Sequence, residues 1–401
     1  MGLGSPFWRF WVAAVLANVG DGIRVAAFPL LAASLTQDPA LVGLVAAAGT
    51  LPWLLTGLLA GSLADRRDRR SLVVAADLAR VSVLAILVAL LLLDRASVAV
   101  VVVAAFLLGV GETFRDTAAQ SIVPRLVPKP LLERANGRLV AGEVVGNEFV
   151  GPLTGAALFA AGVALPFAVN SAALAVGVLL VLSLPAAALA MHHARGDDAA
   201  GVPPGVRAGA RWLARHPLLR MLVGVGVLVA LADSAWFAVL VLYVQERLAL
   251  GAVGFGVLLA AGAGGGLLGA VAADRLVAGH RHRAVLGWSI VAACVVPVLL
   301  VVRPERWVAV VVVVVTSGAF GVFNVAAVSL RHRLVPDALL GRVTATWRTA
   351  VYGAAAVGAL AGGVVASARG LEAPFLLSAA LGVVAAALWW VGTAGLSPGP
   401  A

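Results

Sequence analysis

Long apolar runs alternate with short polar segments along almost the whole chain. Each run has roughly the twenty residues that a helix needs to cross a bilayer core, whereas the spans of a membrane β-barrel are shorter and strictly alternating. The pattern therefore predicts an all-α membrane protein with twelve transmembrane helices. The predicted spans are Trp8 to Ser34, Leu41 to Ala64, Leu72 to Leu93, Val98 to Gln120, Leu139 to Ala161, Pro166 to Met191, Met221 to Tyr243, Ala252 to Ala273, Ala284 to Val302, Trp307 to Leu330, Val343 to Ser367, and Ala373 to Ala394.

Composition agrees with this pattern. The 401 residues are 62% hydrophobic and only 12% charged, about half the charged fraction of a soluble domain. The net charge of +10 comes from arginines between apolar spans, which favours contact with anionic lipid headgroups over nucleic acid. The single cysteine, Cys294, excludes an internal disulfide and a thiolate metal cluster. We expect no metal site and a monomeric protein.

The distribution of basic residues predicts the orientation in the membrane. With a cytoplasmic amino terminus, 22 of the 29 Lys and Arg residues fall on or beside inner loops and termini. Cytoplasmic loops of membrane proteins carry this excess. We therefore expect a multi-pass protein of the bacterial inner membrane with both termini in the cytoplasm. The five basic residues expected outside are Arg95, Arg247, Arg303, Arg306 and Arg369.

The chain also contains an internal repeat. The segment that begins Arg125-Leu126-Val127-Pro128 recurs 208 residues later as Arg333-Leu334-Val335-Pro336. Such parallel repeats occur in transporters built from two similar halves. We predict two pseudo-symmetric six-helix bundles, at 1–190 and 218–401, joined by a cytoplasmic linker at 191–217. Arginines at spacing four, from Arg207 to Arg215, predict an interfacial helix in this linker.

Charged residues inside the spans are the first candidates for function. Each costs on the order of 2.5–3.5 kcal/mol at the centre of a helix unless it has a partner or a water-filled cavity. Asp21 lies about 20 Å along the first helix from Trp8, near the middle of the bilayer. It could bind protons or substrate, or it could simply pair with Arg24 at spacing three. The full set of proton-coupling or substrate candidates is Asp21, Arg24, Glu112, Glu148 and Asp233.

A second set of candidates surrounds the loop between the second and third spans. The stretch Gly61-x-Leu63-Ala64-Asp65-Arg66-x-x-Arg69-Arg70 resembles the signature loop of the major facilitator superfamily, although that family usually has glycine where this chain has Asp68. The resemblance implies a gating network that locks the inner ends of the helices. Its members would be Gly61, Asp65, Arg66, Arg69, Arg70, Asp77, Arg80, Arg115 and Asp116.

The fifth span contains Gly151, Pro152 and Gly155. They resemble the antiporter motif of drug-exporting facilitators, whose last glycine is Ala156 in this chain. Proline and glycine also produce a packing kink without any transport role. Two stretches resemble the branch of enterobactin exporters and macrolide efflux proteins. They are Arg134-Ala135-Asn136-Gly137 and Asn147-Glu148-Phe149-Val150-Gly151-Pro152.

This resemblance implies a secondary active transporter that exports a hydrophobic or amphipathic small molecule, such as a drug, a macrolide or a siderophore, by proton antiport. Its energy would come from the proton gradient, without a cofactor. An importer, a uniporter or a lipid-moving facilitator is the alternative. The sequence contains no recognisable nucleophile or phosphate-binding motif, since the glycine cluster Gly262 to Gly266 lies within an apolar span and no lysine follows it. An enzyme is therefore not expected.

Overall fold

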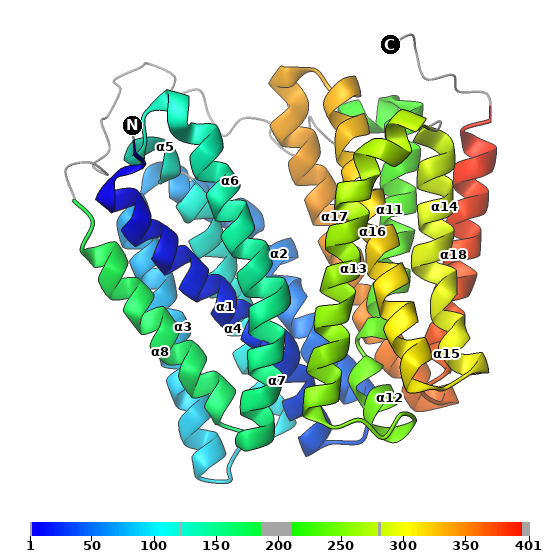
Figure 1. The fold of residues 1–401 in the computed structure, drawn as a ribbon, viewed down its shortest axis with the longest axis horizontal. Helices are drawn as coiled ribbons and strands as arrows, with labels where there is room; N and C mark the ends of the chain where they lie inside the picture. Colours follow the sequence, from blue (N-terminus) through cyan, green and yellow to red (C-terminus); the bar gives the residue numbers. More distant parts are fainter. Residues whose placement is uncertain (1, 121, 186–210, 280–281, 395–401) are drawn as a thin grey trace. The chain divides into compact units, whose positions relative to one another are not determined.

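The computed structural model describes residues 2–120, 122–185, 211–279 and 282–394 (Figure 1). Within these ranges the regular structure is helical, and twelve helices or helix runs are long and apolar enough to cross a membrane. Many large apolar side chains on them are exposed, among them Leu59, Leu179 and Leu268. Such a surface suits lipid rather than water. The predicted all-α fold with twelve spans is confirmed.

The first packing unit centres on α1. This helix contacts α4, α6, η2, α7 and α8, while α3 packs against α4 and α8. Its elements are α1 (Gly4–Leu35), α2 (Pro39–Arg66), α3 (Arg69–Leu92), α4 (Val98–Gln120), α5 (Val123–Leu126), η1 (Lys129–Leu131), α6 (Leu132–Glu143), η2 (Val144–Val150), α7 (Gly151–Ala161) and α8 (Leu165–Leu182). The unit also includes Leu250–Ala260, the start of α13, while the first turn of α2 belongs to the other unit.

The second packing unit centres on α11, which contacts α17 and α18, while α14 packs against α16 and α18. Its elements are α11 (Pro217–Phe237), α12 (Leu240–Glu246), α13 (Ala252–Gly279), α14 (His282–Val295), η3 (Val296–Val298), α15 (Leu299–Val302), α16 (Arg306–Leu334), α17 (Asp337–Arg369) and α18 (Ala373–Gly392). The predicted seventh span is thus two helices, α11 and α12. The turn between them follows Asp233 by one helical turn.

Most of the predicted linker, residues 191–210, lies outside the described residues. The part that is described is helical at 211–215, and His216 separates it from α11, which starts at Pro217. Proline suits the first position of a helix because the amide hydrogen that it lacks would have no helical partner there. The described helical residues 211–215 include Arg211 and Arg215, and the interfacial helix itself stays a prediction. The boundaries of the two predicted bundles stay a prediction.

Asp68 explains how the loop between α2 and α3 closes without the glycine that the superfamily usually has there. Its carboxylate accepts hydrogen bonds from the Ser71 amide at 2.8 Å and the Ser71 hydroxyl at 2.7 Å. An aspartate in this position caps the first turn of a helix and stabilises it by about 1 kcal/mol. The charged loop thus begins α3 through a side-chain cap.

Candidate functional site

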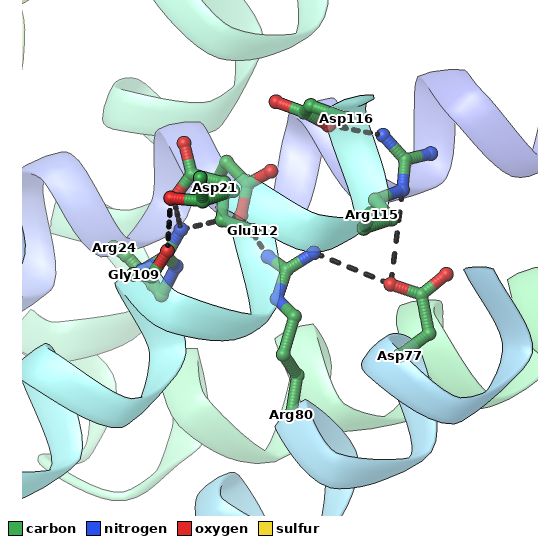
Figure 2. A network of polar contacts seen from close by, with 9 residues as sticks. Asp21, Arg24, Asp77, Arg80, Gly109, Glu112, Arg115 and Asp116 are labelled. Atoms are coloured by element: carbon green, nitrogen blue, oxygen red, sulfur yellow. Dashed lines mark hydrogen bonds and ion pairs between the residues drawn. The ribbon is translucent and has the colours of Figure 1, made fainter. Parts of the chain in front are cut away.

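Seven charged side chains in the first unit form one alternating series, which we call the arginine–carboxylate chain (Figure 2). Every arginine lies between two carboxylates. The order is Glu112, Arg24, Asp21, Arg80, Asp77, Arg115 and Asp116. From the sequence, these seven residues were predicted as two separate sets, the proton-coupling candidates and the gating network. In the structure, members of both sets form one series.

The contacts are close at one end of the chain and longer towards the middle. Arg24 Nη2 lies 2.5 Å from Glu112 Oε2 and 2.6 Å from Asp21 Oδ1. Arg80 donates a hydrogen bond to Asp21 through one nitrogen and reaches Asp77 at 3.4 Å through the other. The remaining two links belong to Arg115, which lies 3.7 Å from Asp77 and 2.9 Å from Asp116.

Three helices supply the chain through ordinary helical spacing. Asp21 and Arg24 lie three apart on α1, and Asp77 and Arg80 lie three apart on α3. The third helix, α4, supplies Glu112, Arg115 and Asp116, which also share one face. Residues three or four apart on a helix are neighbours. Each helix thus brings a charged group to the place where α1, α3 and α4 meet.

Burial divides the chain into an interior and two ends. The Arg80 side chain is fully buried, and those of Asp21 and Asp77 are nearly so. The terminal carboxylates are more open, with 22% of the Glu112 side chain and 28% of the Asp116 side chain exposed. Interior groups have two partners each and terminal groups have one. A change of charge is therefore easiest to accommodate at the ends.

Gly111 makes the room that Arg80 occupies. A Cβ atom added at Gly111 would lie 2.5 Å from Arg80 Cγ and 3.0 Å from Cδ. We expect Gly111→Ala to displace Arg80 from Asp21 and Asp77 and to lower the free energy of unfolding by about 1–3 kcal/mol. Thermal unfolding of the purified protein would measure this. The matched control is Gly224→Ala, where an added Cβ meets nothing within 4 Å. Equal unfolding temperatures for the two variants would contradict the packing role of Gly111.

The signature loop contributes less to the chain than the resemblance implied. The side chains of Asp65 and Arg66 lie outside the described part of the structure. Arg70 donates hydrogen bonds to the carbonyls of Val181 and Leu182, so it ties α3 to the end of α8. Arg69 is not a member of the arginine–carboxylate chain. At Gly61, an added Cβ would contact nothing within 4 Å. Within the described part, the loop holds α3 in place rather than supplying the ion pairs.

Glu148 and Asp233 are not members of the arginine–carboxylate chain. Glu148 is exposed on η2, and Asp233 is partly buried on α11. Among the described residues neither forms an ion pair. Gly151, Pro152 and Gly155 lie on α7 and are buried, and the two glycines face α1.

Two buried asparagines were not predicted as site residues from the sequence. Asn170 on α8 is fully buried, and neither its Oδ1 nor its Nδ2 has a hydrogen-bond partner within the described structure. It fills the space beside Gly20, because an added Cβ there would lie 2.1 Å from Asn170 Oδ1. Asn147 on η2 also has a buried Oδ1 that no described residue hydrogen-bonds. The available signal was an amide side chain inside an apolar span.

The family follows from comparison with known proteins. The profile of the family described as transmembrane secretion effector matches residues 4–394. This chain belongs to that family, within the major facilitator superfamily. The superfamily predicted from the signature loop is therefore confirmed, and its members are transporters rather than enzymes.

Relatives and solved structures agree with this assignment. This family member is 27% identical to the multidrug efflux pump Tap of Mycolicibacterium fortuitum over 386 residues, covering 93% of this chain and 92% of that protein. It is 24% identical to macrolide efflux protein A of Streptococcus pyogenes over 131 residues, about a third of each chain (33% and 32%). Among solved structures, the nucleoside transporter NupG matches with a TM-score of 0.81 at 12% identity, covering 97% of this chain and all of that one (100%). A bacterial homologue of ferroportin matches with a TM-score of 0.77 at 16% identity, covering 98% of this chain and 100% of that one. At these low identities the structures support the fold alone.

Proposed function

We propose that this transporter exports a hydrophobic or amphipathic small molecule, such as a drug, a macrolide or a siderophore-like compound, in exchange for protons. Its two six-helix bundles would expose the transport site to alternate sides of the bacterial inner membrane, with both termini in the cytoplasm. The protein would act as a monomer, surrounded by lipid and without a cofactor. Similarity to a named multidrug efflux pump over 93% of the chain supports the direction and the substrate class.

One observation supports proton coupling most directly. The arginine–carboxylate chain contains four carboxylates and three arginines, so it holds one carboxylate in excess. An uncompensated charge inside a membrane protein is costly. One bound proton would make the chain neutral, and so would the ammonium group of a cationic substrate. The proton and such a substrate would thus compete for the same negative charge, which is the requirement for exchange.

Glu112 is the member that best fits this role. Among the described residues its one ion-pair partner is Arg24, and Arg24 keeps Asp21 as a partner when Glu112 takes up a proton. A proton on Asp21 would instead weaken two contacts at once, those with Arg24 and Arg80. Removing one partner from a buried ion pair costs on the order of 3–5 kcal/mol. Asp21 therefore anchors the chain, and Glu112 exchanges the proton.

The other terminal carboxylate, Asp116, lies four residues before the end of α4 at Gln120. In the predicted topology this end faces the cytoplasm. A group near one membrane face stays in contact with that face, whereas the deeper Glu112 can be exposed to each side in turn. Glu148 and Asp233 are second candidates because both are acids within spans and neither has an ion pair among the described residues.

The direction of transport can be tested in cells that express the protein. We expect a proton ionophore to raise the accumulation of a cationic dye such as ethidium by several fold, because export stops when the gradient collapses. Cells that carry the empty vector provide the baseline. A fall in accumulation would identify an importer, and a change no larger than in the control cells would indicate a uniporter.

A further inference from the structure

The fifth span contains a π-turn between two α-helices. Residues Val144–Val150 form η2, in which hydrogen bonds reach back five residues instead of four, and the amide of Gly151 donates to the carbonyl of Gly146. Such a turn holds one residue more than the α-helix around it and often occurs at functional sites. The function proposed above does not use this feature.

The spacing of four glycines matches the π-turn. Gly142, Gly146, Gly151 and Gly155 all face α1, at intervals of four, five and four residues. An α-helix turns about 100° per residue, so an interval of five would rotate Gly151 about 140° away from Gly146. A turn of the i to i+5 type brings these two residues back to one face. The extra residue therefore lies at the one interval that needs it.

The contacts with α1 show why the face must be continuous. An added Cβ at Gly151 would lie 2.5 Å from Gly22 Cα, and one at Gly155 would lie 2.5 Å from the Ile23 carbonyl oxygen. These are contacts between backbones, which cannot move aside as a side chain can. Glycine is the residue that allows helices to approach so closely. If the span were α-helical throughout, α6 and α7 could not both keep their glycines against α1.

The same turn removes one expected donor from the Asn147 carbonyl, and the Asn147 side chain carries an acceptor that is unpaired among the described residues. In the i to i+5 pattern the Asn147 carbonyl would accept from residue 152, but Pro152 has no amide hydrogen. This carbonyl oxygen points at α1, since an added Cβ at Gly22 would lie 2.4 Å from it. The buried Oδ1 of Asn147 has no hydrogen-bond partner in the described part of the structure. Unpaired acceptors in a membrane interior are costly, and they are retained where they bind something.

We infer that the π-turn is a positioning element for transport. Its extra residue keeps the glycine face of span five on α1 and holds Asn147 with its carbonyl oxygen against Gly22, the residue that follows Asp21, and with its Oδ1 unpaired among the described residues. These acceptors take a hydrogen-bond donor, such as a water molecule on the proton path, during the cycle. This inference rests on the proposed proton-coupled transport.

Two single-residue deletions test the register. Deletion of Val150 changes the glycine intervals to four, four and four, which suits an unbroken α-helix. We expect this variant to fold with an unfolding temperature close to that of the wild type, but with kcat for proton-driven transport reduced about tenfold or more. Deletion of Leu153 is the matched control, because Leu153 is as exposed as Val150, at 41% against 43%. It shortens the last interval to three, so we expect loss of folded protein.

Variants of Asn147 test the acceptor. We expect Asn147→Leu to leave the unfolding temperature close to that of the wild type, to lower kcat with KM changed by less than about threefold, and to flatten the pH profile of transport. We expect Asn147→Gln, which keeps the amide, to restore part of kcat.

Transport and folding are read separately in purified protein and in proteoliposomes. A Val150 deletion with the kcat and pH profile of the wild type would overturn the inference, and so would one that unfolds like the Leu153 deletion. An Asn147→Leu variant that transports normally would overturn the acceptor role. If the wild type itself carries nothing under a pH gradient, the proposed function fails, while the unfolding temperatures still decide the register.

Discussion

Glu112→Gln is expected to abolish proton-driven transport of a cationic substrate while the protein still folds. Glutamine is nearly isosteric with glutamate, and its amide oxygen can still accept the hydrogen bond that Arg24 donates at 2.5 Å. The variant resembles the permanently protonated state, so the chain no longer has a carboxylate in excess. Without a group that gains and loses the proton, a pH gradient cannot drive the cycle. Uptake of a cationic dye into inside-out proteoliposomes, driven by an imposed pH difference, should fall to the level of protein-free vesicles.

Two further measurements make the Glu112 experiment specific. Exchange of labelled for unlabelled neutral substrate without a gradient should persist, because it requires the alternation of the two bundles and not the negative charge that Glu112 supplies. Asp116→Asn is the matched control, since Asp116 is also a terminal carboxylate with one arginine partner. It should retain gradient-driven uptake at a reduced rate. Full proton-driven uptake by Glu112→Gln would show that Glu112 does not carry the proton. Glu148 and Asp233 would then be the remaining candidates.

The sequence predicted the fold well because a membrane span is a local property. Length and the lack of charge define each helix without reference to the rest of the chain. Departures from the simple spans occur where the local signal was weaker. The break between α11 and α12, at 238–239, lies in a continuous apolar stretch that contains no proline and no glycine. Its residues all suit a helix, and only the packing of this segment explains the turn.

The candidate site was predicted in parts. Helical spacing brings Asp21 to Arg24 and Asp77 to Arg80, and both pairs exist. The link between Asp21 and Arg80 spans 59 positions and depends on how α1 and α3 both pack against α4 and α8, which no local pattern encodes. The space that Gly111 leaves for Arg80 also depends on helix packing, so the sequence alone did not predict it. The interval of five between Gly146 and Gly151, followed by Pro152, was a readable signal of the π-turn, but only once α1 is known to be the opposing surface.

The second large effect is expected for Arg80→Met, which removes the central arginine of the chain. Arg80 is fully buried and lies between Asp21 and Asp77. Methionine is apolar and replaces the aliphatic stem of arginine, so the change removes the guanidinium group with its charge and its hydrogen bonds. Because Asp21 and Asp77 each lose one of two buried partners, the free energy of unfolding should fall by about 3–5 kcal/mol. Chemical unfolding in detergent micelles would measure the change.

The double variant Arg80→Met with Asp77→Asn separates this charge effect from lost packing. It removes one positive and one negative group together, and the remaining carboxylates each keep an arginine, Glu112 and Asp21 with Arg24 and Asp116 with Arg115. Replacing both members of a buried pair costs much less than breaking it. The double variant should therefore recover a large part of the stability that the single variant loses. If it is as unstable as Arg80→Met or less stable, the loss comes from packing around Arg80 and not from an unpaired carboxylate. If Arg80→Met is as stable as the wild type, the chain does not hold α1, α3 and α4 together, and its charges serve transport alone.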